Sequence, residues 1–131
     1  MQLMTDDIKA SLLANWQAEG EDHKPVAKFF DPSGAATWLI TEMSAEDNDI
    51  LFGLCDLGIG FPELGYLRLS ELESVKGRLG LGIERDLYFE RRFPISVYAE
   101  AARQAGGITE ANRILAQAAA ALETEKRRRR P

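Results

Sequence analysis

The sequence has very little of the two residue types that build most nucleophilic and transition-metal sites. Its 131 residues include one histidine, His23, and one cysteine, Cys55. They cannot supply the three or four nitrogen and sulfur ligands of a zinc site, and one cysteine cannot form an internal disulfide. A nucleophile–base pair would need His23 beside Cys55 or a serine, whereas His23 lies in a polar segment. We expect no catalytic residues, metal or cofactor, and favour a protein that is not an enzyme.

Long hydrophobic runs are also missing. The apolar stretches are a few residues long, whereas a membrane-spanning helix needs about 20 apolar residues. The first residues show neither the basic nor the apolar region of a signal peptide. Together with the single cysteine, these absences favour a cytoplasmic protein with no membrane partner.

Basic residues are scarce outside one short segment. The chain has 16 Lys and Arg against 21 Asp and Glu, a net charge of −5. Five of the basic residues, Lys126, Arg127, Arg128, Arg129 and Arg130, follow one another near the C-terminus. Without them 11 basic residues face 21 acidic ones, a net charge of −10. Such a body repels nucleic acid and anionic lipid and suits a basic or neutral protein partner.

Several short segments predict β-strands. Residues 26–30, 36–43, 50–56 and 64–69 are rich in β-branched and aromatic side chains and are separated by turn residues. Turns this short join antiparallel neighbours, so a four-strand meander is expected. The alternating segment 83–90 predicts a fifth strand. The glycines of segment 77–82 indicate a turn rather than a phosphate-binding loop, because they lack the order and the lysine of such loops.

Helical patterns flank this predicted sheet. Thr5 is suited to cap a helix whose apolar side chains recur every four residues and which stops near Gly20. The segment 70–73 fits a capping box at the start of a short helix. Pro94 suits the first position of a helix that ends at Ala105, and Thr109 the cap of a last, alanine-rich helix.

The expected fold is therefore of the α+β class. A twisted antiparallel sheet of about five strands carries the N-terminal helix on one face, and two helices follow the sheet. We divide the chain into an α+β core domain over residues 1–92 and a helical C-terminal extension over residues 93–131.

Several short blocks resemble a bacterial family that is known only as a domain of unknown function. The blocks are Lys28 to Pro32, Trp38, Thr41-Glu42, Leu51 to Leu54, Glu63 to Tyr66, Ser70 to Glu73 and Ile83 to Phe89. The resemblance covers roughly residues 3–90 and leaves residues 93–131 outside. Members of that family are common on plasmids, conjugative elements and prophages. The resemblance implies a compact α+β domain in a mobile-element setting, and it implies no reaction.

Arg85 is the most informative charged residue of the predicted strands. The alternation of segment 83–90 places its guanidinium on the apolar side, where a buried arginine needs a carboxylate partner such as Glu42 or Glu63. The simpler reading is an ion pair at the edge of the sheet. The functional alternative is a cleft for a small ligand or substrate around Arg85, Glu42 and Glu63, with Trp38 or Tyr66 as a stacking wall.

The leading hypothesis is a non-enzymatic accessory protein of a mobile element. It would bind a host or element-encoded protein through an acidic surface and counter a host defence system. The expected patch comprises Glu63, Tyr66, Glu84, Asp86 and Tyr88, which we place on the exposed side of neighbouring strands.

Two alternatives involve the C-terminal helix. Nucleic acid would bind through the basic residues Lys126 to Arg130, although a solvated helix end is the simpler interpretation. The alanine-rich stripe of this helix would either lie thinly on the body or pack against a second copy to form a homodimer.

Overall fold

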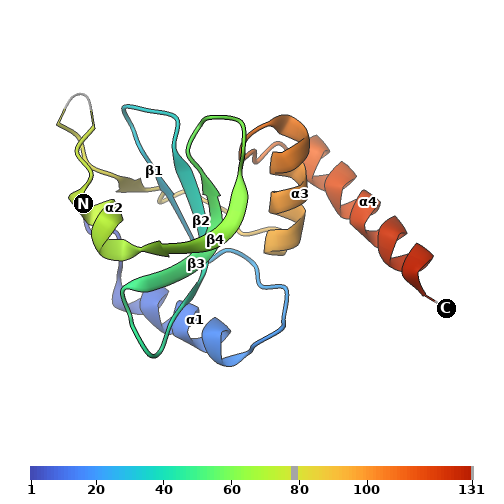
Figure 1. Cartoon of the computed structure of the whole chain (residues 1–131), viewed down its shortest axis with the longest axis horizontal. Helices are drawn as coiled ribbons and strands as arrows, with labels where there is room; N and C mark the ends of the chain where they lie inside the picture. Colours follow the sequence, from blue (N-terminus) through green and yellow to red (C-terminus); the bar gives the residue numbers. More distant parts are fainter. Residues whose placement is uncertain (78–79, 131) are drawn as a thin grey trace.

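The chain forms a five-stranded antiparallel sheet with helices on both faces, so the predicted α+β class is confirmed (Figure 1). This computed structural model describes residues 1–77 and 80–130. The sheet order is β4-β3-β2-β1-β5. In chain order the elements are α1 (Asp6–Gln17), β1 (Ala27–Phe30), β2 (Thr37–Met43), β3 (Ile50–Asp56), β4 (Glu63–Arg68), α2 (Leu69–Ser74), β5 (Glu84–Arg85), α3 (Ile95–Ala105) and α4 (Asn112–Arg129).

The first four strands form the meander that the sequence predicts, and each begins and ends within one residue of its predicted bounds. The fifth strand is much shorter than predicted. Glu84 and Arg85 form the strand beside β1, and the Asp86 N–H still donates to the Lys28 oxygen at 2.9 Å. The chain then turns, and the Asp86 side chain accepts a hydrogen bond from the Tyr88 N–H at 2.9 Å. Of the predicted turn 77–82, residues 78–79 lie outside the described part, and Lys76 and Gly82 form an antiparallel bridge beside them.

The first face of the sheet packs against α1. Thr5 caps this helix as predicted, because its Oγ1 accepts a hydrogen bond from the Ile8 N–H at 3.3 Å. Leu12 is fully buried in a core that includes Phe29 and Ile40 from the sheet. The N-terminal segment joins the same core through Leu3, which is 3% exposed.

The second face packs against α3 and the first half of α4. Leu39 and Leu54 from the sheet meet Tyr98 of α3 and Leu115 of α4 in a second core. Gly106 ends α3 with a φ of 82°, a left-handed conformation that glycine adopts without strain. The C-terminal extension therefore supplies one wall of a core whose other wall is the sheet. Figure 1 shows α4 continuing past α3, away from the sheet.

Three helices begin differently from the predictions. The capping box at Ser70 is not formed, because α2 starts at Leu69 and Ser70 donates both its N–H and its hydroxyl to Asp49, at 2.8 and 2.7 Å. Thr109 does not cap α4, which starts at Asn112. Pro94 lies just before α3, whose Ser96 N–H donates to the Asp22 side chain at 3.1 Å. Two of the helix starts are thus capped from distant segments.

No helix in the described part of the chain is both long enough and apolar enough to span a membrane.

Candidate functional site

The five residues of the predicted acidic and aromatic patch lie at opposite edges of the sheet. Glu63 and Tyr66 are on β4, whereas Glu84 is on β5 and Asp86 and Tyr88 follow it. Three strands separate β4 from β5. The expectation of neighbouring strands is wrong because β5 pairs with β1 instead of continuing the meander beyond β4. The structure thus places Glu63 and Tyr66 at one edge of the sheet and Glu84, Asp86 and Tyr88 at the other.

The residues of the predicted cleft are also separated. Trp38 is buried in the core beneath α1 and is 7% exposed. A β-bulge between Ile40 and Glu42 shifts the alternation of β2, so that Glu42 lies opposite Phe52 while Trp38 lies opposite Cys55. Residues 52 and 55 of a strand face opposite sides of the sheet. Trp38 and Glu42 therefore do not share a face.

Arg85 lies on the apolar side of the sheet, as the alternation predicts, but its partners are not carboxylates. It pairs with Phe29, whose side chain is buried in the core under α1. Its Nη1 donates hydrogen bonds to the backbone oxygens of Gln2 and Leu3, at 2.7 and 3.1 Å. Glu63 lies on the strand at the far edge of the sheet. Arg85 thus holds the N-terminal segment and does not line a cleft with Glu42 or Glu63.

The two residues with nucleophile or base chemistry have structural surroundings. The His23 Nε2 lies 3.0 Å from the Ala18 backbone oxygen, just beyond the end of α1. Cys55 is half-buried on β3, and burial raises the pKa of its thiol. In the described part of the chain, no group of three or more His, Cys, Asp or Glu side chains is arranged to hold a metal ion.

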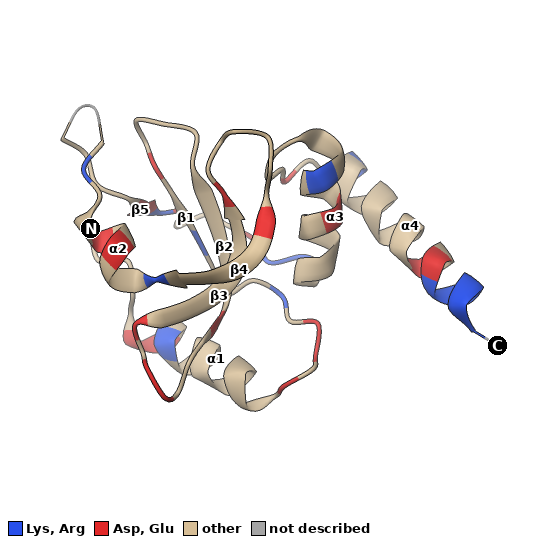
Figure 2. Ribbon diagram, in the orientation of Figure 1, with Lys and Arg blue, Asp and Glu red and all other residues tan. Residues whose placement is uncertain are grey.

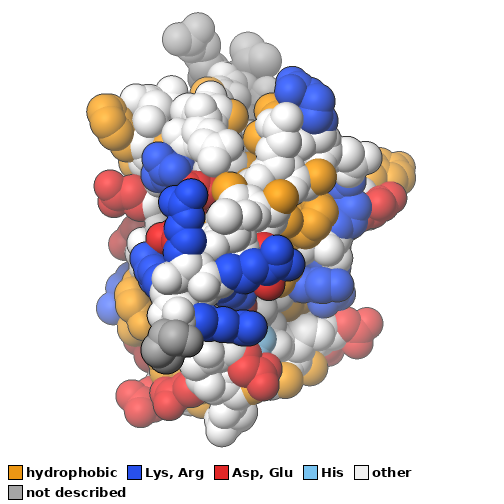
Figure 3. Space-filling model, turned by 90° about the vertical axis from the view of Figure 1, so that its right-hand side faces the viewer, with side chains coloured by type: hydrophobic (Ala, Val, Ile, Leu, Met, Phe, Trp, Pro, Cys, Tyr) orange, Lys and Arg blue, Asp and Glu red, His pale blue; other side chains and the backbone are white. Residues whose placement is uncertain are grey.

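The basic cluster, Lys126 to Arg130, lies at the free end of α4. Leu115 and Ala118, in the first half of the helix, are buried against the body, whereas every residue from Glu123 to Arg130 is exposed. The charged end projects from the body in Figure 2, and Figure 3 shows Lys and Arg side chains gathered on the face seen from that side. Arg129 pairs with Glu125 at 2.6 Å. The alanine-rich stripe packs on this chain's own α3, and a homodimer through α4 stays a prediction.

A different surface emerges at the edge of the sheet formed by β4. The loop before this strand exposes three apolar side chains, Leu57, Ile59 and Phe61, which are 61%, 69% and 75% exposed. Leu64 and Tyr66 on the strand itself are 45% and 67% exposed. We call these five residues the β4-edge surface. Exposed apolar side chains clustered in this way mark interaction sites in soluble proteins.

The sequence of this loop contains a pattern that indicates a contact surface, but we interpreted the loop as a turn because of its glycines. Gly58 and Gly60, with φ of 81° and 91°, adopt the left-handed region and were predicted correctly as turn residues. Between and around them the chain alternates glycine with large apolar residues. A turn needs no such side chains, so their presence in a loop is the pattern that points to a contact surface.

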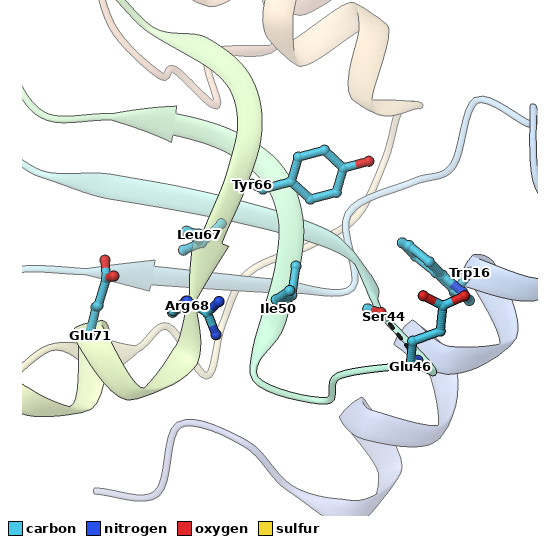
Figure 4. Close-up of a pocket in the computed structure, with 8 residues that line it drawn as sticks. All are labelled: Trp16, Ser44, Glu46, Ile50, Tyr66, Leu67, Arg68 and Glu71. Carbon is cyan, nitrogen blue, oxygen red and sulfur yellow. Dashed lines mark hydrogen bonds between the residues drawn. The ribbon is translucent and has the colours of Figure 1, made fainter.

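Hollows adjoin β4 on both faces of the sheet. One, of about 540 Å³, lies between Leu64 on the strand and Ala99 and Leu122 on α3 and α4. A second, of about 320 Å³, lies between the strand and Leu72 and Val75, beside α2. A third, of about 480 Å³, extends from Arg68 and Tyr66 to Trp16 at the end of α1 (Figure 4). In that view the Tyr66 and Trp16 rings lie on the same side of the β4 ribbon.

Carboxylates predominate along the rim of this surface. Glu46, Glu63 and Glu71 are exposed, and none of them forms a salt bridge within residues 1–77 and 80–130. The two nearby basic side chains are already paired. Arg68 lies 3.5 Å from both Asp47 and Asp49, and Arg103 forms a two-pronged pair with Glu100. The rim therefore presents net negative charge to a partner.

The fold and this surface define a small α+β domain whose sheet is covered by helices on both faces and whose β4 edge carries exposed apolar side chains. The chain belongs to a family described as protein of unknown function (DUF2958), which matches residues 3–109. The match therefore reaches further than the predicted 3–90 and includes all of α3, which packs on the sheet. No curated protein and no solved structure matches the chain.

Proposed function

We propose that this protein acts by binding another protein through the β4-edge surface and catalyses no reaction itself. The observation that supports the proposal is the run of exposed apolar side chains from Leu57 to Tyr66. Burying such side chains in an interface removes apolar area from water, which is the main favourable term in protein association. Protein interfaces combine an apolar and aromatic centre with a polar rim, and Phe61 and Tyr66 are typical anchors for such a centre.

The charge of the body indicates the class of partner. Glu63 and Glu71 at the rim lie on a body with a net charge of −10, so a partner surface rich in Lys and Arg is attracted and an acidic one is repelled. The acidic composition, which favours a basic or neutral protein partner, supports the same proposal. The proposed binding surface is centred on β4, and it contains Glu63 and Tyr66 of the originally predicted patch.

The resemblance to proteins of mobile elements supplies a setting for the proposal. In that setting the partner is a host or element-encoded protein, and a host defence protein is the class we would test first. The single cysteine, Cys55, supports a cytoplasmic location, where thiols stay reduced.

The test compares two double variants that add the same charge at opposite edges of the sheet. Ile59→Asp with Phe61→Asp alters the β4-edge surface, and Leu87→Asp with Tyr88→Asp alters residues beyond β5 that are 62% and 90% exposed. Each protein is used as bait in a bacterial lysate, and circular dichroism checks that it is folded. We expect the first variant to lose a partner that the second retains. Equal retention or equal loss by both variants would contradict the proposal.

A second candidate function is nucleic-acid binding by the end of α4. The observation that favours it is the exposure of Lys126 to Arg130 on a helix end that projects from the body. Neutralising phosphates with these side chains would release counterions and make binding steeply dependent on salt. Fluorescence anisotropy with a labelled DNA duplex at several salt concentrations tests it. Binding should vanish when residues 126–131 are removed, and binding that survives their removal would exclude the tail.

A further inference from the structure

The backbone of β4 offers hydrogen-bonding groups on its outer side. Leu69, just after the strand, donates its N–H to the Asp49 oxygen at 2.9 Å, in the same register as the pairs of β3 with β4. In an antiparallel pair every second residue exchanges hydrogen bonds with its opposite. Counting back from Leu69, residues 63, 65 and 67 bond to β3. Leu64 and Tyr66 therefore direct their N–H and C=O groups away from the sheet. Arg68 directs its N–H the same way, whereas its C=O accepts the first hydrogen bond of α2.

We propose that β4 binds an extended segment of the partner protein, which pairs with Leu64, Tyr66 and Arg68 as a sixth strand. This inference rests on the proposed function and specifies how the partner binds. The described part of the chain places a strand on only one side of β4. The strand spans six residues, long enough for several backbone hydrogen bonds, and has no proline within it.

The edge of β4 lacks most of the features that normally keep such edges from pairing, and its two charged residues, Glu63 and Arg68, stand at its two ends. Natural proteins protect edge strands with prolines, lysines, bulges or a covering segment. The paired register of β4 with β3 runs without a shift from Glu63 to Arg68. The proline nearest to the strand, Pro62, precedes it. The groups that face outward are thus accessible to another strand.

The hollows beside β4 indicate which side chains the added strand carries. Successive side chains of a strand point to opposite faces of the sheet. One set would lie over the hollow lined by Leu64, Ala99 and Leu122, and the other over the hollow beside α2, lined by Leu72 and Val75. Apolar surface predominates in the lining of both hollows. Apolar side chains on either face of the added strand would therefore fit them.

Glutamates at the same hollows add the preference for basic residues. Glu63 lines the hollow at α3, where Glu100 is already paired with Arg103. Glu71 lines the hollow at α2 beside Arg68, which is paired with Asp47 and Asp49. The occupant we infer is therefore an extended protein segment with apolar side chains on both faces and Lys or Arg among them. A second copy of this chain is disfavoured as the occupant, because two bodies of the same net negative charge repel each other.

The central test separates the backbone of Tyr66 from its side chain. Tyr66→Pro removes both the side chain and the outward N–H, whereas Tyr66→Ala removes only the side chain. Proline is tolerated on an edge strand when its missing N–H would face solvent. Thermal unfolding checks that both variants fold. If Tyr66→Pro unfolds, Leu64→Pro and Leu64→Ala form an equivalent pair.

The probes are synthetic peptides of about eight residues, the length of a typical strand. One set alternates Val or Ile with Lys or Arg, a second has the same composition in shuffled order, and a third replaces the basic residues by Glu. Binding is followed by the amide NMR signals of the full chain. We expect the alternating basic set to bind and to slow hydrogen exchange at the amides of Leu64, Tyr66 and Arg68.

Affinity for the alternating set should fall about tenfold more in Tyr66→Pro than in Tyr66→Ala, which corresponds to one lost backbone hydrogen bond. Equal losses in the two variants, or equal binding of the shuffled set, would overturn strand pairing. Protection of the same amides by self-association at higher concentration would assign the edge to a second copy and would also overturn it. If no peptide binds but the lysate partner still depends on Ile59 and Phe61, strand addition fails and the proposed function stands. If the lysate partner does not depend on those residues, the proposed function itself fails.

Discussion

The two edge strands of the sheet differ in length and in what covers them. At the β5 edge the strand is two residues long, and the N-terminal segment crosses it. The Arg85 N–H lies 3.1 Å from the Met1 sulfur, and the Arg85 guanidinium donates to two backbone oxygens of the same segment. At the β4 edge the strand spans six residues, and exposed apolar side chains accompany it. An exposed edge is an aggregation hazard unless it has a use.

The two edges differ in whether their polar groups make contacts within the chain. The closed edge uses Arg85 for internal contacts, and Lys28 of the adjoining β1 binds both Asp86 and Glu110. The Lys28 contacts fix β1, the segment after β5 and the segment before α4 to one another. The open edge keeps Glu63, Tyr66 and the backbone of β4 for other contacts. Substitutions at the closed edge should therefore affect stability, and substitutions at the open edge should affect binding.

The largest expected effect is at the closed edge. Leu3→Ala should lower the free energy of unfolding by about 2–5 kcal/mol, because it leaves a cavity where a 3% exposed side chain packs in the core. The matched variant Leu64→Ala, at a side chain 45% exposed, should change it by less than about 0.5 kcal/mol. Urea unfolding measures both. Similar losses in the two variants would remove the distinction between the edges.

A smaller effect is expected at Lys28. Burial lowers the pKa of this amine, but the contacts with Glu110 and Asp86 outweigh burial and raise the pKa above 10.5. Since the pKa is higher in the folded chain, this stabilisation is complete below pH 10.5 and is lost as the pH rises through the folded value. At neutral pH, Lys28→Met should cost about 1–2 kcal/mol. Urea unfolding at rising pH should show the gap between wild type and variant shrinking; a constant gap would argue against the ion pairs.

Asp49 gives a test at the open edge, because it joins the turn before β3 to the end of β4. Hydrogen bonds from the Ser70 hydroxyl and N–H lower the pKa of its carboxyl below 3.8. A lowered pKa means that this stabilisation is present above pH 3.8 and is lost as the pH falls through the folded value. Asp49→Asn keeps an acceptor but does not titrate. The urea midpoint should therefore fall less steeply with acid in the variant, and parallel curves would count against this role.

The smallest effect on stability is expected for a charge placed on the open strand. Leu64→Lys should change the free energy of unfolding by no more than about 0.5 kcal/mol, because a lysine at this exposed position can extend into solvent. It should also reduce self-association at high concentration, since lysine is a common protection of edge strands. Light scattering against concentration measures this. A loss of stability as large as that of Leu3→Ala would show that β4 is not an open edge.

The elements of the fold were predictable because their signals are local. Alternation located β1 to β4 within one residue, and the helical repeat with Thr5 located α1. Segment 83–90 also alternates, yet only two of its residues form a strand. Pairing there depends on the position of β1 in space and on the turn at Asp86, and a pattern of side chains carries no information about either.

The candidate site was less predictable because it depends on contacts between distant segments. The sheet order separated Glu63 from Glu84, and the bulge before Glu42 turned that side chain away from the face of Trp38. Likewise, Asp49 and Asp22 cap helices that begin 20 or more residues later. Glu63 and Tyr66 were recognised, but as part of a patch on two neighbouring strands. Recognising an open edge requires the whole sheet.

The placement of charge along α4 has a consequence for how the molecule approaches others. The acidic body carries a run of five basic residues at the far end of a projecting helix, which gives the protein a large permanent electric dipole moment. In the field of a charged surface the molecule would rotate before contact, with Lys126 to Arg130 turned toward an anionic surface and the body turned away. Encounter with a partner would thus begin from a preferred orientation, and added salt would weaken that preference.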